Sequence, residues 1–264
     1  MLTLTGINIY PVKSLGGISI DSSFAGKRGL NSDRRFLLVD KTGMFLTQRD
    51  LPEMALLKLS PAEDGFNITN SLKNESIRIP LAPDTTEKTR VKIWDDFCDA
   101  LPVSKQLDEW FSEALNIHCS LVYMPDTTER PVEKKYLSED HIVSFADAYP
   151  YLIIGQSSLD DLNKRLDFPV PMNRFRPNLV FSGGIPYTED GWHVFNAGTT
   201  RLRAVKPCAR CMITTTNQET AELGKEPLKT LSSYRNVNGK VMFGMNVVCE
   251  KEGILSVGDK IELL

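Results

Sequence analysis

The sequence lacks the features that direct a chain into or across a membrane. No uninterrupted apolar stretch approaches the ~20 residues that a membrane-spanning helix requires. The first seven residues have neither the basic start nor the long apolar run of a signal peptide. We therefore expect a cytoplasmic protein without a membrane partner.

The chain also lacks an excess of charge of either sign. Its 31 lysines and arginines are balanced by 34 aspartates and glutamates, which leaves a formal net charge of −3 at pH 7. Proteins that bind nucleic acid in a general way usually carry a strongly basic balance. The composition therefore disfavours a nucleic-acid partner.

Histidine and cysteine are both sparse. The three histidines lie far apart, and the five cysteines stand at positions 98, 119, 208, 211 and 249. An odd number of cysteines, without the spacing of a small secreted scaffold, disfavours a disulfide framework and fits reduced thiols in the cytosol. We interpret the histidines as ordinary surface or core residues.

What remains is the composition of a soluble globular protein, with 41% hydrophobic and 25% charged residues in a chain of 264. This length allows one large domain or two interleaved ones. Alternating apolar residues between turn signals predict short strands at 2–9, 35–39, 55–59, 91–94, 178–181 and 245–248. Apolar residues at helical spacing predict helices at 104–116 and 157–166.

These patterns predict a predominantly β (α+β) fold with few helices. We expect barrel-like sheets and a division near residue 120 into two closely packed parts. The charged, proline-flanked stretch 125–140 predicts a flexible loop or linker.

Residues 205–216 combine sulfur with positive charge. Cys208 and Cys211 flank Arg210, and Lys206 precedes them. Thiolate is a soft ligand suited to a transition metal, and neighbouring cations favour the thiolate over the thiol. This pattern predicts a reactive or metal-ligating sulfur beside an anion-binding surface.

Three interpretations of this Cys-x-x-Cys pair compete. A structural zinc site needs four ligands, and the remaining cysteines and histidines provide no second pair. A thioredoxin-like dithiol needs a helix that begins at the cysteines, whereas residues 212–216 predict a strand. A single thiolate ligand to an oxophilic metal, with the other cysteine structural, fits the pattern better.

Two basic segments occur early in the chain. Lys13 and Ser14 precede paired glycines, and this combination can hold an anion through the ammonium group and closely approaching backbone amides. A plain glycine turn is the alternative. Arg34 and Arg35 enter an apolar strand, so one of them needs a carboxylate or phosphate partner. A neighbouring aspartate would make that a purely structural ion pair.

A third basic segment lies at 173–178. Arg174 and Arg176 have the two-residue spacing of one strand face, and Asn178 adds an amide, so together they predict a fork for a polyoxygen anion. An edge strand with solvated arginines is the alternative. Six cations and few acids lie between residues 174 and 210. This local excess predicts a focused site for a small anionic molecule.

Together, four motifs resemble the MOSC family, a name that denotes domains similar to the C-terminal part of molybdenum-cofactor sulfurase. The motifs are Tyr-Pro-Val-Lys-Ser at 10–14, Arg-Phe at 35–36, Asn-Arg-Phe-Arg-Pro-Asn at 173–178 and Cys-Ala-Arg-Cys at 208–211. The resemblance runs nearly end to end and is closest to YcbX-like proteins and the mitochondrial amidoxime-reducing component. It implies a β-barrel-like MOSC N-terminal domain over 1–120, packed against a MOSC domain over 121–264 that binds molybdenum cofactor (Mo-molybdopterin).

The resemblance also implies roles for single residues. Cys211 would be the catalytic residue and the protein thiolate on molybdenum, and Cys208 would not be a ligand. A set of polar side chains would hold the pterin and its phosphate: Lys13, Ser14, Arg35, Arg176, Asn178, Arg210 and Asn246. Residues 147–149 would add further contacts.

The implied activity is that of a molybdenum-dependent oxidoreductase that reduces N-hydroxylated or N-oxygenated compounds. The cofactor would supply the redox chemistry, and the protein the thiolate, orientation and electrostatics. The sequence contains no plant-type iron–sulfur motif and no pyridoxal phosphate-dependent half. We therefore expect electrons from a separate flavoprotein or ferredoxin-like donor. The alternatives are a non-redox carrier of a Cys211 persulfide, or cofactor-binding protein, in metallocentre assembly, and a zinc-stabilised binding module.

Overall fold

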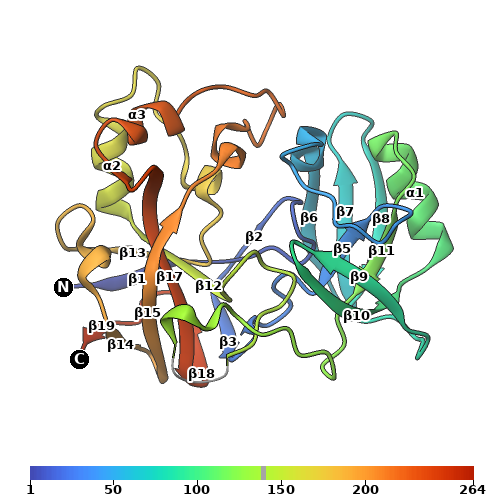
Figure 1. Cartoon of the computed structure of the whole chain (residues 1–264), viewed down its shortest axis with the longest axis horizontal. Helices are drawn as coiled ribbons and strands as arrows, with labels where there is room; N and C mark the ends of the chain where they lie inside the picture. Colours follow the sequence, from blue (N-terminus) through green and yellow to red (C-terminus); the bar gives the residue numbers. More distant parts are fainter. Residues whose placement is uncertain (138–140) are drawn as a thin grey trace.

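The computed structural model describes residues 1–137 and 141–264, and β-strands predominate there. Two β-rich lobes lie side by side, and both chain ends lie in one of them (Figure 1). We call the lobe with the chain ends the large lobe, and residues 36–123 the small lobe. The predominantly β fold with few helices, predicted from the sequence, is confirmed.

The large lobe is built on one extended sheet. Its strands are β1 (Thr3–Ile9), β2 (Ile18–Ile20), β12 (Tyr151–Gly155), β13 (Leu179–Ser182), β14 (Val194–Ala197), β15 (Thr200–Ala209), β16 (Asn236–Val237), β17 (Lys240–Lys251) and β19 (Ile261–Leu263). In the described ranges their order is β19-β14-β15-β17-β12-β13-β1-β2, with β16 paired to β17. A second sheet joins β3 (Ser22–Gly26), β4 (Gly29–Leu30) and β18 (Gly253–Ser256).

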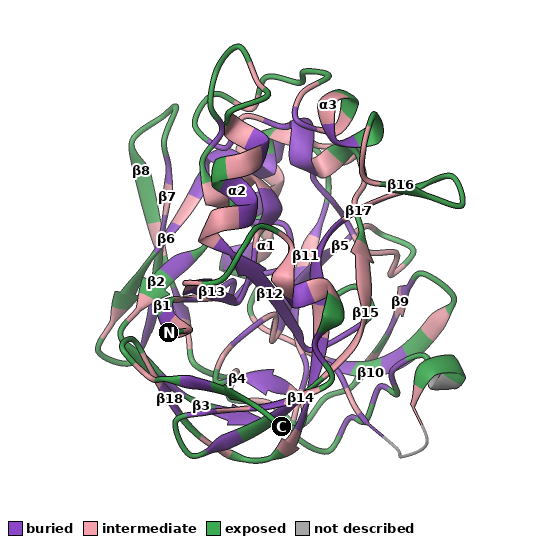
Figure 2. Cartoon of the chain, turned by 90° about the vertical axis from the view of Figure 1, so that its left-hand side faces the viewer, coloured by how far each residue is buried: buried purple, intermediate pink, exposed green. Residues whose placement is uncertain are grey.

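Burial explains the order of the central strands. All five residues of β12 are apolar or glycine and buried, and β12 lies between β13, to which it is parallel, and β17. Such a run is typical of a strand covered on both faces, and Figure 2 shows β12 buried and the β16 hairpin exposed. Because β1 pairs with β13 and β3 with β18, the first thirty residues belong in space to the large lobe. The predicted boundary near residue 120 therefore does not separate the sheets.

The small lobe contains two smaller sheets and one long helix. One sheet has the order β5 (Phe36–Val39), β11 (Ser120–Tyr123), β10 (Asp96–Pro102) and β9 (Thr89–Ile93), and the other joins β6 (Leu57–Ala62), β7 (Gly65–Asn70) and β8 (Glu75–Pro80). The 3-10 helix η1 (Pro52–Leu56) leads into β6.

Helix α1 (Lys105–Leu115) lies on the outer side of the small lobe (Figure 1). It begins where Ser104 Oγ accepts a hydrogen bond from the backbone N–H of Leu107 at 3.2 Å, and it ends at Asn116, which adopts the left-handed conformation. Its apolar stripe is buried against the sheets. The helix predicted at 104–116 is confirmed.

The remaining helices are short: α2 (Gln156–Asn163), α3 (Leu228–Ser232) and the 3-10 helices η2 (Lys134–Tyr136), η3 (Met172–Phe175), η4 (Thr188–Gly191) and η5 (Met212–Thr215). Two of them correct the sequence predictions. The strand expected at 212–216 is η5 over most of its length. Arg174 belongs to η3, and Arg176 follows it with a φ of 54°, so the two arginines do not share a strand face.

Within 1–137 and 141–264, no helix is both long and apolar enough to cross a bilayer.

The predicted loop 125–140 contains η2, and its Pro131 forms a β-bridge with Ile142. Its last three residues, 138–140, lie outside the described residues.

Candidate functional site

A cavity of about 270 Å³ gathers most of the residues that the sequence singled out. Its walls come from the β1–β2 connection, from residues 146–152, from the turn after η3 and from the chain around the cysteines. Seven of the eight predicted site residues line it: Lys13, Ser14, Arg176, Asn178, Arg210, Cys211 and Asn246.

The cavity is strongly cationic. Six lining side chains carry a positive charge: Lys13, Arg34, Arg49, Arg176, Lys206 and Arg210. Of the lining residues, all of which the structure describes, only Asp147 is a carboxylate. Low-dielectric walls concentrate the field of such a group of charges. The arrangement suits an anionic ligand with several oxygen or sulfur atoms.

The ring of Tyr10 organises two of these cations. The guanidinium carbons of Arg34 and Arg176 lie 4.5 and 4.2 Å from the centre of the ring, which is the geometry of cation–π contacts. The Tyr10 hydroxyl donates to the carbonyl of Pro177 at 3.2 Å, and burial raises the pKa of Tyr10 to about 12. Gly17 leaves room for the ring, because a Cβ there would lie 2.5 Å from Tyr10 Cε1.

Arg34 and Arg176 differ in how their charge is compensated. Arg34 Nη1 donates to Asp33 Oδ2 at 2.6 Å and to Asn178 Oδ1 at 2.9 Å. Within the described chain, Arg176 donates from Nη1 to the carbonyl of Leu15 at 2.7 Å and has no carboxylate partner. Burial lowers the pKa of Arg176 to about 10. Arg176 is therefore a desolvated cation that an anionic ligand would stabilise.

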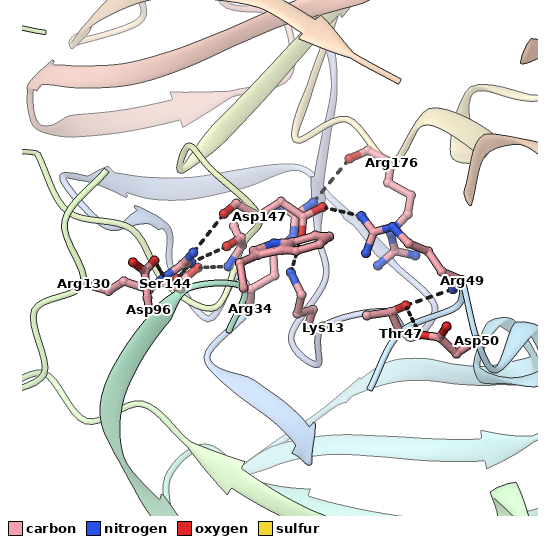
Figure 3. A network of polar contacts seen from close by, with 12 residues as sticks. Lys13, Arg34, Thr47, Arg49, Asp50, Asp96, Arg130, Ser144, Asp147 and Arg176 are labelled. Atoms are coloured by element: carbon pink, nitrogen blue, oxygen red, sulfur yellow. Dashed lines mark hydrogen bonds and ion pairs between the residues drawn. The ribbon is translucent and has the colours of Figure 1, made fainter. Parts of the chain in front are cut away.

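Asp147 lies at the centre of a network of polar contacts beside Lys13, Arg49 and Arg130 (Figure 3). Its carboxylate accepts from Lys13 Nζ at 2.5 Å, from Trp94 Nε1 at 3.3 Å and from Arg49 Nη2 at 3.4 Å. Arg130 donates to the backbone carbonyl of Asp147 at 3.0 Å and so fixes the loop. Arg49 and Trp94 belong to connections of the small lobe, so this carboxylate joins both lobes at the cavity.

The Lys13–Asp147 pair has perturbed protonation equilibria. The Lys13 side chain is 7% exposed, whereas that of Asp147 is 52% exposed. Burial lowers the pKa of Lys13 to about 8, although Asp147 acts in the opposite direction. Burial would raise the pKa of Asp147, but Lys13 and Arg49 together hold it well below its usual range. Asp147 therefore stays ionised at neutral pH.

Arg35 is the predicted site residue that the structure does not bring to the cavity. Its Nε donates to the carbonyl of Met124 at 3.0 Å, its Nη2 pairs with Asp126 at 2.8 Å, and its guanidinium carbon lies 5.0 Å from the centre of the Tyr123 ring. Arg34 takes the place expected for Arg35. Arg34 has a φ of 48°, and this turn directs the two neighbouring side chains to different sides of the chain.

This placement predicts different effects for two adjacent substitutions. Arg34→Met should weaken the binding of an anionic ligand by roughly tenfold or more, because a charge-assisted contact is lost. Arg35→Met removes an equal charge at the adjacent residue and should change the binding affinity less than twofold. Titration calorimetry of both variants with inorganic phosphate would measure the difference. Equal losses in the two variants would contradict the assignment of Arg34.

Cys208 and Cys211 are both partly exposed at the cavity. Arg210 Nη1 donates to Cys208 Sγ at 3.1 Å, and its Nη2 donates to the carbonyl of Phe175 at 2.6 Å, while its buried Nε has no hydrogen-bond partner. Among the residues that the structure describes, none forms a hydrogen bond with Cys211 Sγ, so Cys208 is the cysteine that is held in the wall.

The other three cysteines are buried, and burial raises the pKa of each thiol to about 11: Cys98, Cys119 and Cys249. They are therefore poor nucleophiles and poor ligands at neutral pH. In the part of the chain that the structure describes, no three His, Cys, Asp or Glu side chains are grouped to hold a metal ion. A metal at Cys211 would thus need most of its ligands from a bound molecule.

The chain is similar to known proteins over nearly its whole length. Residues 1–118 match the family described as the MOSC N-terminal beta barrel domain, and residues 140–262 match the MOSC domain. Mitochondrial amidoxime-reducing component 1 of Mus musculus is 30% identical to this chain over 281 residues, covering 99% of the chain and 82% of that protein. The chain belongs to the MOSC family. The human protein of the same name is 29% identical over 280 residues, covering 99% and 83%.

A second group of relatives is longer. Molybdenum cofactor sulfurase of Solanum lycopersicum is 32% identical over 287 residues, covering 98% of this MOSC chain. The chain spans only 35% of the length of that sulfurase. Both matched regions of the MOSC chain contribute to the cavity, because Lys13, Ser14, Arg34 and Arg49 precede residue 118 and the remaining lining residues follow residue 140.

Sequence reasoning missed three parts of the site. Tyr10 was read as part of a motif but not as the platform for two guanidinium groups. Arg49 and Trp94 carried no local signal, because their contacts with Asp147 join segments 98 and 53 residues apart.

Proposed function

We propose that this MOSC protein binds a molybdenum–pterin cofactor in the cavity, with Cys211 as the protein ligand to the metal. We further propose that it reduces N-hydroxylated or related N-oxygenated compounds. The observation that carries the proposal is the accessible thiol of Cys211 in a cavity where six cations face one carboxylate. Relatives named as amidoxime-reducing components and as molybdenum cofactor sulfurases support the choice of cofactor.

The residues present fit such a group. A pterin cofactor carries a phosphate and electron-rich sulfur atoms, and both need positive charge. Arg176 lacks a carboxylate partner, and the Nε of Arg210 is buried without a hydrogen bond. We propose that these two side chains, with Lys13 and Arg34, hold the anionic parts of the cofactor. Cys211 supplies a soft ligand, and Ser14, Asn178 and Asn246 line the same space.

The bound cofactor would supply two-electron chemistry. In the proposed reaction, an N-hydroxylated compound takes up two electrons and two protons, its N–O bond breaks, and an amine-type product and water are released. The chain itself would orient the substrate and restrict water in the cavity. Asp147 is a poor proton donor because its pKa is held well below its usual range. We therefore propose solvent water as the source of protons.

Electrons would come from a separate flavoprotein or ferredoxin-like protein, because the chain has no iron–sulfur motif. We propose a cytoplasmic location, since all five cysteines are free thiols in the structure.

The proposal is tested with the wild-type chain expressed in a host that makes abundant molybdenum cofactor. We expect near-stoichiometric molybdenum by mass spectrometry and pterin fluorescence after extraction. With a chemical or enzymatic reductant, the loaded protein should convert an N-hydroxylated amidine to the amidine. Folded protein with neither molybdenum nor pterin would contradict the proposal.

A second function is a non-redox carrier of sulfur, or cofactor-binding protein, in metallocentre assembly. The similarity to the tomato sulfurase over nearly the whole chain favours it. Cys211 would then carry a persulfide on the accessible sulfur. Peptide mass spectrometry that finds a persulfide on Cys211, in protein free of molybdenum, would support the carrier and exclude the reductase.

A further inference from the structure

Two buried glutamines meet between the lobes, beside the cavity. Gln48 follows β5 in the small lobe and is 0% exposed, and Gln218 follows η5 and is 6% exposed. Their side-chain amides bond to each other: Gln218 Nε2 donates to Gln48 Oε1 at 3.0 Å, and Gln48 Nε2 donates to Gln218 Oε1 at 3.4 Å. Reciprocal bonding of two buried amides across 170 residues joins distant parts of the chain.

Each amide also holds a segment that forms the cavity. Gln48 Nε2 donates to the carbonyl of Ser14 at 2.6 Å. Ser14 lines the cavity and has a φ of 68°, a conformation that is costly for a residue other than glycine. Gln218 Nε2 donates to the carbonyl of Thr216 at 3.3 Å, so it braces the chain just after Cys211 and η5.

The backbone around both glutamines is fixed from the small lobe. Lys58 Nζ donates to the backbone carbonyl of Gln218 at 2.5 Å and pairs with Glu219 at 3.0 Å. Gln48 belongs to a turn in which the N–H of Asp50 donates to the carbonyl of Thr47 at 3.1 Å. Arg49, the next residue of this turn, reaches Asp147 at the cavity. One turn of the small lobe therefore lines the cavity through Arg49 and holds the Ser14 segment through Gln48.

We infer that Gln48 and Gln218 act as a positioning pair that sets the Ser14 turn and the Cys211 segment in their relative places. Neither glutamine lines the cavity, so the pair acts through the two segments that it holds. Loss of one amide leaves the other buried without its partner, which costs more than the bond itself contributes. The segments then separate locally while the sheets stay intact. The inference rests on the proposed function only for the identity of the ligand.

The test measures alkylation of Cys211 by iodoacetamide in the full, cofactor-free chain, with peptide mass spectrometry to separate Cys211 from Cys208. Gln48→Met and Gln218→Met keep the side-chain length and remove the amide. We expect each substitution to raise the alkylation rate of Cys211 roughly tenfold, because loss of the buried hydrogen-bond network lets the Cys211 segment separate locally from the Ser14 turn. The double variant should be no faster than either single variant, because the pair acts as one unit.

A matched control separates positioning from general stability. Asn70 is another buried amide, 3% exposed, and it accepts hydrogen bonds from the backbone of its own turn in the small lobe. Asn70→Leu should lower the thermal midpoint and leave the alkylation rate of Cys211 within twofold of the wild type. If either methionine variant fails to fold, Gln48→Asn or Gln218→Asn, which keep an amide but shorten its reach, replaces it with the same expected result.

Three outcomes would overturn the inference: unchanged Cys211 alkylation in both glutamine variants, an equal rise in Asn70→Leu, or additive rises in the double variant. Because the assay uses no cofactor, its result is independent of the molybdenum analysis of the wild-type protein. A chain that binds no molybdenum but shows the coupled rise would refute the proposed function and keep the positioning pair.

Discussion

Cys211→Ser is expected to give a folded protein that retains under a tenth of the molybdenum of the wild type and has no measurable turnover. A serine hydroxyl is not ionised at neutral pH and is a harder donor than thiolate, so the protein's bond to molybdenum is lost. The side chain is partly exposed and the exchange is nearly isosteric, so the free energy of unfolding should change by about 0.5 kcal/mol or less. Metal analysis and calorimetry of the same preparation measure both quantities.

Cys208→Ser is the matched control for this variant. Cys208 accepts a hydrogen bond from Arg210 and lines the same cavity, yet we assign it no bond to the metal. Its serine variant should keep most of the molybdenum and at least a third of the turnover. Full loading and full turnover in Cys211→Ser, or equal losses in the two variants, would show that the thiolate of Cys211 is not the ligand.

The sequence allowed the fold class to be predicted because its signals are local. Short apolar runs between turn residues marked β1, β5, β9, β13, β17 and part of β6, and the apolar stripe marked α1. The other strands, including the buried central strand β12, were not predicted. Motifs shared with a family added the order of the domains. The interleaving of the lobes was not readable, because pairing of β1 with β13 and of β3 with β18 joins residues more than 170 positions apart.

Errors at the site arose where one residue of register decides which way a side chain points. Spacing of two residues predicted a strand for Arg174 and Arg176, but η3 and a left-handed Arg176 separate them. Arg34 and Arg35 are chemically equal in sequence, and the φ of 48° at Arg34 decides which one faces the cavity. Backbone turns of this kind depend on tertiary contacts, here the bond from Arg34 N–H to the carbonyl of Tyr10 at 2.9 Å.

Contacts made by single side chains from the small lobe had no sequence signal at all. Gln48, Arg49 and Trp94 are ordinary residues in turns, and their partners are 34 to 170 residues away. Sequence reasoning therefore named most of the predicted residues that line the cavity and missed the side chains that hold them in place.

Anion binding by the wild-type chain is expected to weaken as the pH rises above about 8. In the ligand-free protein, burial lowers the pKa of Lys13 to about 8 from its ordinary value of 10.5. A bound anion favours the ammonium form and raises this pKa, so between the two pKa values binding takes up a proton. Affinity is therefore constant below pH 8 and falls above it, by at most tenfold for each pH unit.

Lys13→Met should lower the affinity for an anion and abolish its pH dependence. Loss of a buried charge-assisted contact should weaken binding of sulfate, an anion that does not titrate in this range, roughly 10- to 100-fold at pH 7, and the remaining affinity should be constant from pH 7 to 9. Lys88→Met is the control, because Lys88 pairs with Asp99 on an exposed hairpin of the small lobe, and it should bind like the wild type. Calorimetric titrations at pH 7, 8 and 9 test all three chains. If the affinity of Lys13→Met still falls above pH 8, another cavity group is responsible for the pH dependence. Arg176 would then be the first to examine, because burial lowers its pKa to about 10 and so brings it nearest to this pH range after Lys13.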